Sequence, residues 1–148
     1  MSSDPDAPHP SEVRGIVLTH GTMCDGMVDA VRKIAGIEGD ALTPISNEGR
    51  GPEELALAVE QISALHPTLI FTDLQTGSCA LAARLACRSP SGVRVVFGTN
   101  LPMLLDFVFH RDLPLDDLLE RLINLGRRAI DSFEPEAVER GDRSISRR

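Results

Sequence analysis

Residues 15–21 read GIVLTHG, and residues 68–74 read TLIFTDL. Each stretch is a short apolar and β-branched run that stops at a chemically capable side chain, His20 in the first and Asp73 in the second. Continuous apolar runs of this length, bounded by turn or polar residues, are typical of strands that are buried on both faces. The two stretches therefore predict buried strands of a parallel sheet.

Strand and helix patterns alternate on either side of these two runs. Residues 40–45 and 93–99 also have strand composition, and Pro44 favours a sheet edge for the first because proline has no N–H to donate. Helices are expected at residues 25–34, 52–65, 77–88, 102–110 and 115–130. Four strand–helix alternations predict an α/β fold, a doubly wound sheet of four parallel strands with helices on both faces. We expect the strand order 2-1-3-4, which makes the strands of His20 and Asp73 neighbours.

The two ends of the chain differ in composition from the middle. Residues 1–12 contain three prolines, two aspartates and three serines, which predicts a flexible N-terminal arm. Residues 13–133 are expected to form one domain, and residues 134–148 a polar, arginine-rich tail. A chain of 148 residues is long enough to bury roughly two-thirds of its unfolded surface without a metal or a disulfide.

Composition excludes several classes of protein. The net charge of −7 and the absence of Trp and Tyr argue against nucleic acid as a partner. Three cysteines without CxxC spacing indicate reduced thiols, and no apolar stretch reaches membrane-spanning length. The N-terminus lacks the basic start and apolar segment of a signal peptide. A cytoplasmic protein is therefore expected.

Polar side chains follow three of the predicted strands, at the point where each strand ends. They are His20, Asp73 and the pair Thr99 and Asn100. Ligands of open parallel sheets bind beyond the carboxyl ends of the strands. Neighbouring strands lie about 4.8 Å apart, so Asp73 is expected to reach His20. A carboxylate on one imidazole nitrogen fixes the tautomer and leaves the other nitrogen as a nucleophile.

Several chemistries remain open on these residues alone. Gly77 and Ser78 begin the next helix, whose backbone N–H groups would face an anion held on His20. Phosphoryl transfer, metal binding and small-ligand binding all fit this pattern, although the Walker A, Rossmann and nucleophile-elbow motifs are missing. The metal alternative is a zinc cluster of His20, Cys24, Asp73 and Cys79. Because these residues are not closely paired on one turn, no metal is expected, and because the nucleotide-binding motifs are missing, no cofactor is expected.

Three blocks resemble the enzyme IIA domain of the mannose class of the bacterial phosphoenolpyruvate-dependent sugar phosphotransferase system. They are GIVLTHG at residues 15–21, FTDL followed by TGS within residues 71–78, and GTNLPMLLD at residues 98–106. The resemblance extends from about residue 13 to residue 130 and implies that His20 is phosphorylated and that Asp73 orients it. The residues that it implies beside the phosphoryl group are Gly21, Gly77 and Ser78. The resemblance also implies that Thr99, Asn100 and Pro102 lie at the rim of the site, where partner proteins bind.

The function implied by the resemblance is that of a phosphocarrier. HPr, the histidine-containing phosphocarrier protein, would phosphorylate His20 at Nε2. A histidine of an enzyme IIB component would then accept the phosphoryl group. The group would serve sugar uptake through a membrane permease or a regulatory relay. Two alternatives share the fold: a phosphocarrier subunit that supplies dihydroxyacetone kinase, and a regulatory binding module that is not phosphorylated.

The resemblance also implies a homodimer. Either apolar residues of the helix at 115–130 are left uncovered for a second copy, or residues 129–133 add an antiparallel strand to the partner's sheet edge.

The turn after Asp73 departs from the resembling family. Family members usually have Gly-Gly-(Ser or Thr)-Pro, whereas this chain has Gln75-Thr76-Gly77-Ser78-Cys79. A missing glycine restricts the loop, and a missing proline removes preorganisation from the first helical turn. The fit to partners or the transfer rate is therefore expected to differ.

Overall fold

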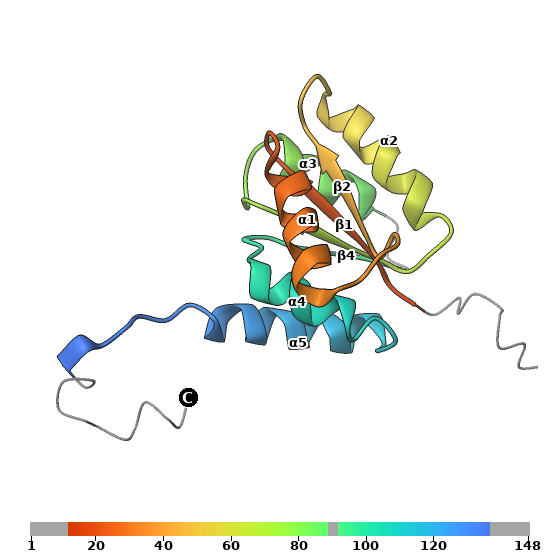
Figure 1. The fold of residues 1–148 in the computed structure, drawn as a ribbon. Helices are drawn as coiled ribbons and strands as arrows, with labels where there is room; N and C mark the ends of the chain where they lie inside the picture. The colour runs from red at the N-terminus through yellow and green to blue at the C-terminus, as the bar shows by residue number, and fades with distance from the viewer. Residues whose placement is uncertain (1–11, 89–91, 137–148) are drawn as a thin grey trace, which may run out of the picture.

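Four parallel strands form one sheet in the order β2-β1-β3-β4, as predicted (Figure 1). The computed structural model describes residues 12–88 and 92–136 of the chain. The strands are β1 (Arg14–Thr19), β2 (Leu42–Ser46), β3 (Thr68–Thr72) and β4 (Val93–Val96). The strand expected to be at an edge because of Pro44, β2, is at one.

The register brings the carboxyl ends of three neighbouring strands to one level. The last residues of β1 and β2, Thr19 and Ser46, are partners. The last residue of β3, Thr72, pairs one position earlier in β1. The chain therefore leaves all three strands at the same edge of the sheet, and the residues that follow them lie close together.

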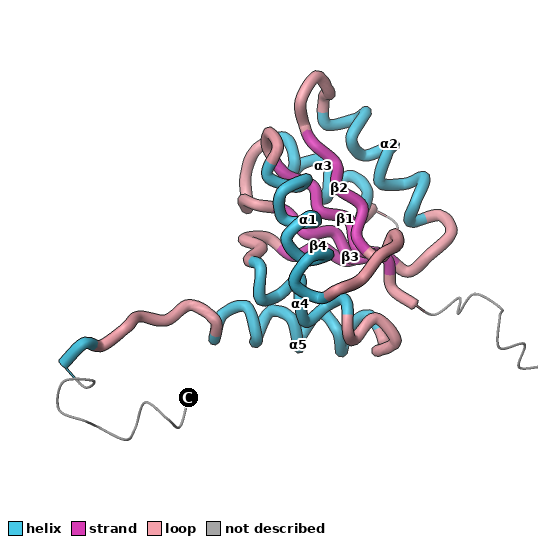
Figure 2. The backbone as a smooth tube through the Cα atoms, viewed as in Figure 1, coloured by secondary structure: helices cyan, strands magenta, loops and turns pink. Residues whose placement is uncertain are grey.

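Helices cover both faces of the sheet (Figures 1 and 2). One face carries α1 (Met23–Ala35), α4 (Leu101–Val108) and α5 (Leu115–Arg128). The other face carries α2 (Pro52–Ser63) and α3 (Ser78–Ala86). No helix in the described ranges has the length and apolar character that a membrane crossing requires.

Close packing holds β1 in the centre of the sheet. The rings of Phe71 in β3 and Phe107 in α4 meet edge to face, with centroids 5.2 Å apart. A Cβ on Gly15 would lie 2.5 Å from Leu42 Cδ2 and 2.7 Å from the Phe107 ring. Only glycine fits at this position, so the strand that ends at His20 is fixed against its neighbours.

Several element ends differ from the predicted ends by one to three residues. β4 stops at Val96 rather than residue 99, because Gly98 has a φ of +68° and interrupts the extended backbone. The N–H of Thr99 still donates to the carbonyl of Thr72 at 3.1 Å. Residues 129–133 follow α5 away from the body and form no strand in this chain (Figure 1). Most of the expected N-terminal arm and C-terminal tail lies outside the described residues.

Candidate active site

His20 and Asp73 leave adjacent strands and meet at the edge of the sheet. Nδ1 of His20 lies 2.8 Å from Oδ2 of Asp73, and the same oxygen accepts the backbone N–H of His20 at 2.9 Å. The other oxygen, Oδ1, accepts the N–H of Leu74 at 3.0 Å. An ionised carboxylate only accepts hydrogen bonds, so Nδ1 carries the hydrogen and the lone pair of a neutral imidazole is on Nε2.

The carboxylate of Asp73 is ionised and nearly buried, whereas the imidazole of His20 is accessible. Burial raises the pKa of Asp73, but the hydrogen bonds from the backbone and side chain of His20 outweigh burial, and the pKa lies below its usual value. The side chain of Asp73 is 10% exposed and that of His20 is 39% exposed. Asp73 is therefore ionised at neutral pH, and a partner protein can reach the imidazole.

Nε2 of His20 lies beside the start of α3. Gly77 precedes this helix with φ +94° and ψ −175°, a conformation essentially restricted to glycine. A Cβ on Gly77 would be 3.3 Å from Nε2, so the missing side chain leaves room at this nitrogen. From Ser78 onward, the first N–H groups of α3 have no partners within the helix and carry partial positive charge. The setting favours a negatively charged group on Nε2.

The loop after β2 holds the residue that follows His20. Oδ1 of Asn47 accepts the N–H of Gly21 at 3.1 Å, and Oγ of Ser46 donates to the carbonyl of Gly21 at 2.7 Å. Nδ2 of Asn47 lies 3.5 Å from Oγ of Ser78 at the start of α3. Sequence reasoning missed Ser46 and Asn47 because residues 46–51 have a loop pattern. Their signal is a position at the end of β2, where the strand-end rule applies equally.

The turn after Asp73 is held by an arginine of α3. The guanidinium of Arg84 donates to the carbonyl of Gln75 at 2.9 Å and lies over the ring of Phe97, 4.8 Å from its centroid. These contacts tie the turn to α3 and to the segment after β4. They provide order in a turn that lacks the second glycine and the proline of the resembling family.

Donors of the metal alternative also come together. One ligand atom each from His20, Asp73 and Cys79 lie within 4.8 Å of one another, and Cys24 is not in this group. Cys79 is fully buried, and burial together with the charge of Asp73 raises the pKa of its thiol to about 11. The thiol is therefore protonated at neutral pH, while Nδ1 is bonded to Asp73. The arrangement fits a nucleophilic imidazole better than a ready set of metal ligands.

The predicted rim residues have different surroundings. Thr99 is buried, and its hydroxyl has no hydrogen-bond partner among the described residues. Asn100 caps α4, with Oδ1 accepting the N–H of Met103 at 3.2 Å and Nδ2 donating to the carbonyl of Gly126 at 2.9 Å. The amide of Asn100 thus joins α4 to α5. Pro102 is exposed.

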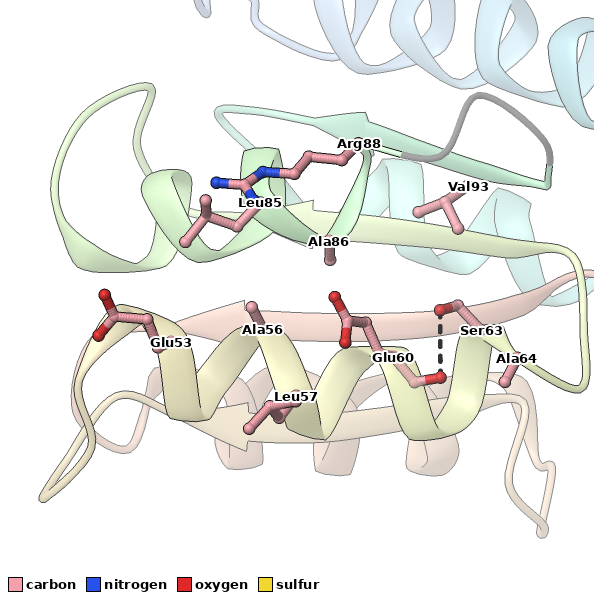
Figure 3. A pocket seen from close by; sticks show the side chains of 10 residues that line it. All are labelled: Glu53, Ala56, Leu57, Glu60, Ser63, Ala64, Leu85, Ala86, Arg88 and Val93. Atoms are coloured by element: carbon pink, nitrogen blue, oxygen red, sulfur yellow. Dashed lines mark hydrogen bonds between the residues drawn. The ribbon is translucent and has the colours of Figure 1, made fainter.

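A cavity of about 690 Å³ lies between α2 and α3 (Figure 3). Glu53 and Glu60 of α2 and Arg88 beyond α3 line it together with small and apolar side chains. None of its lining residues comes from the strand ends that carry His20 and Asp73, so the cavity is separate from the site.

Comparisons with known proteins identify the family of the chain. Residues 15–122 match the family model described as PTS system fructose IIA component, where PTS is the phosphotransferase system. The chain is 31% identical over 136 residues to the PTS system sorbose-specific EIIA component of Klebsiella pneumoniae, covering 86% of this chain and 97% of that protein.

Two solved structures have the same fold. A phosphotransferase system component EIIA from Streptococcus agalactiae has a TM-score of 0.75 and 24% identity, over 82% of this chain and 97% of that one. A mannose/sorbose specific IIA subunit from Enterococcus faecalis has a TM-score of 0.71 and 23% identity, over 83% and 96%. On the sequence matches and the shared fold together, the chain belongs to the mannose-class enzyme IIA family of the sugar phosphotransferase system.

Proposed function

We propose that this protein accepts a phosphoryl group from phospho-HPr on Nε2 of His20 and passes it to a histidine of an enzyme IIB component. The observation that carries the proposal is the orientation of His20. Asp73 holds Nδ1 at 2.8 Å, and Nε2 is left beside Gly77 and the start of α3. The group would then serve sugar uptake or regulation linked to the phosphotransferase system.

The transfer requires positioning rather than acid–base chemistry. The lone pair of Nε2 forms a bond to phosphorus as the N–P bond of phospho-HPr breaks, and that electron pair returns to the imidazole of HPr. The hydrogen on Nδ1 stays between His20 and Asp73, whose carboxylate stabilises the positive charge that develops on the ring. Both ends of the step are imidazoles, so the reaction is nearly isoenergetic and alignment limits its rate.

The test is phosphorylation in a reconstituted system of phosphoenolpyruvate, enzyme I and HPr. Intact-mass analysis should show the gain of one acid-labile phosphoryl group, which His20→Ala abolishes. His110→Gln is a matched control, because Nδ1 of His110 also has a carboxylate nearby, 3.3 Å from Oδ1 of Asp106. It should be phosphorylated like the wild type. A folded wild-type protein that gains no phosphoryl group would contradict the proposal.

The same assay separates the two alternatives. Adding an enzyme IIB component or dihydroxyacetone kinase to the phosphorylated protein identifies which acceptor removes the group. A regulatory binding module would bind partners without ever gaining it.

We also propose a homodimer in which the segment after α5 adds to the partner. In the described part of the chain, α5 has no exposed large apolar side chain, whereas Ile130 and Phe133 are 78% and 73% exposed. Among the residues that the structure describes, no strand pairs with the outer edge of β4, and a cavity of about 310 Å³ beside it is lined in part by Val95 and Phe97. The addition of a strand at this edge would cover these apolar side chains and pair the outward-facing backbone N–H and C=O groups of β4.

A further inference from the structure

The oxygen and the nitrogen of the Asn47 side-chain amide contact different residues. Because a backbone N–H can only donate, the amide atom 3.1 Å from the Gly21 nitrogen must be the oxygen. The amide nitrogen is therefore the atom near Ser78, and its distance of 3.5 Å from Oγ is long for a hydrogen bond. An amide nitrogen carries two hydrogens, and Asn47 is only half-buried, so Nδ2 has donor capacity to spare.

Nδ2 of Asn47 and Nε2 of His20 both lie at the start of α3. Ser78, which Nδ2 approaches, directly follows Gly77, and Gly77 leaves the room next to Nε2 of His20. A phosphoryl group on Nε2 would extend toward the start of α3 and therefore toward Asn47. The site then has a side-chain donor from the loop after β2 in addition to the backbone N–H groups of α3.

The loop that carries Asn47 is anchored independently of this amide. Oγ of Ser46 donates to the carbonyl of Gly21 at 2.7 Å and accepts the N–H of Glu48 at 3.1 Å. Ser46 itself is the last residue of β2, paired with Thr19. A rigid support of this kind is what a preorganised donor needs, because it does not have to be ordered during the reaction.

We propose that Asn47 is a catalytic residue of phosphoryl transfer, an inference that rests on the function proposed above. Oδ1 keeps Gly21 in place, while Nδ2 donates to an oxygen of the phosphoryl group during transfer and on phosphorylated His20. Asn47 makes and breaks no covalent bond. The Nε2–P bond forms as the donor's N–P bond breaks, and the amide only exchanges its weak contact with Ser78 for a phosphoryl oxygen.

Three variants separate donation from positioning. Asn47→Asp retains an oxygen for the N–H of Gly21 but replaces the donor with a carboxylate oxygen that repels the phosphoryl group. Asn47→Ala removes both ends of the amide. Ser46→Ala removes a bond to Gly21 and leaves the donor, so it is the matched control for loop position. The measurement is the initial rate of phosphorylation over a range of phospho-HPr concentrations, alongside urea unfolding of each variant.

We expect both Asn47 variants to lower the maximal rate by about tenfold or more, with Asn47→Asp at least as slow as Asn47→Ala. The phospho-HPr concentration for half-maximal rate should change little, and Ser46→Ala, which keeps the donor but removes one anchor of its loop, should lose clearly less of the maximal rate than either Asn47 variant. A wild-type rate in Asn47→Asp, or an equal loss in Ser46→Ala and Asn47→Ala, would overturn the inference.

A second measurement applies if Asn47→Asp does not fold. The phosphorus NMR resonance of phosphorylated Asn47→Ala should move relative to that of Ser46→Ala, because a donor to the phosphoryl oxygens is lost. An unchanged resonance would overturn the inference as well. Failure of the wild type itself to gain a phosphoryl group is a separate outcome, which removes the proposed function and this inference with it.

Discussion

Asp73 uses its two oxygens for three hydrogen bonds, and two of them go to His20. The backbone bond holds the end of β1 in place, and the side-chain bond sets which nitrogen of the ring is free. One carboxylate therefore determines both the position and the tautomer of His20.

Replacing this carboxylate by an amide should affect the reaction more than the fold. In Asp73→Asn the amide keeps the shape of the side chain but cannot stabilise the positive charge that develops on the ring. We expect phosphorylation by phospho-HPr to slow by at least about tenfold, which corresponds to about 1.4 kcal/mol. Rapid-quench kinetics measures this rate, and circular dichroism checks the fold. Unchanged kinetics would show that Asp73 serves only as a structural cap.

Gly77 is a residue where a single methyl group should harm both the fold and the reaction. An alanine there would have to adopt φ near +94°, and its Cβ would lie 3.3 Å from Nε2 of His20. We expect Gly77→Ala to cost about 1–3 kcal/mol in the free energy of unfolding and to slow phosphorylation. Gly26→Ala in α1 is the control, because its Cβ would meet nothing within 4 Å. That variant should gain up to about 1 kcal/mol in urea unfolding. Equal stability of the two variants would argue against strain at Gly77.

Part of the site could be predicted from single residues and part could not. The His20–Asp73 contact follows from two strands that each end in a functional side chain. Asn47 was missed because a polar loop sequence does not reveal that β2 ends level with β1. The end of β4 was predicted at Thr99 rather than Val96, because the strand pattern continues through Gly98 and a pattern contains no φ angles.

Among the elements, α4 and α5 are joined by one capping residue in addition to their core packing and the Arg121–Asp106 ion pair. Asn100 accepts a hydrogen bond from the first turn of α4 and donates to the carbonyl of Gly126 in α5. The packing is close, because a Cβ on Gly126 would lie 2.6 Å from Cε of Met103. The loop after β4 thus contributes to the packing of α4 against α5.

Asn100→Ala should therefore loosen two helices at once. The lost cap costs about 1 kcal/mol and the lost bond to Gly126 about another, so we expect a loss of about 2 kcal/mol in urea unfolding. Asn100→Asp keeps the oxygen that caps α4, but it replaces Nδ2 with a second carboxylate oxygen, which repels the carbonyl of Gly126. This variant should therefore also be less stable than the wild type. A wild-type stability in Asn100→Ala would show that the link contributes nothing.

The types and order of the elements were the most predictable features of the fold. Alternating buried runs and amphipathic stretches predict parallel strands with crossover helices, and the expected order 2-1-3-4 is confirmed. The ends of elements depend on local backbone angles, such as those of Gly77 and Gly98. The observed ends therefore differ from the predicted ends by a few residues.

At the scale of the whole molecule, the proposed dimer has a specific test. Light scattering at micromolar concentration should give roughly twice the 16.0 kDa mass of the chain. A chain ending at Ala129 should be monomeric, because it lacks Ile130 and Phe133. Leu57→Ser, which changes an apolar side chain on α2 that is 60% exposed, should leave the dimer intact. A monomeric full-length chain would contradict the dimer, and a dimeric truncated chain would contradict this route to it.

The position of the phosphoryl group on the ring tests the central claim most directly. Phosphorylated protein labelled at the histidine nitrogens is observed by nitrogen NMR, and the coupling to phosphorus identifies the bonded atom. Because Asp73 lies 2.8 Å from Nδ1, we predict that Nε2 of His20 carries the group and that Nδ1 keeps its hydrogen. A phosphoryl group on Nδ1, or on any residue other than His20, would contradict the arrangement described here.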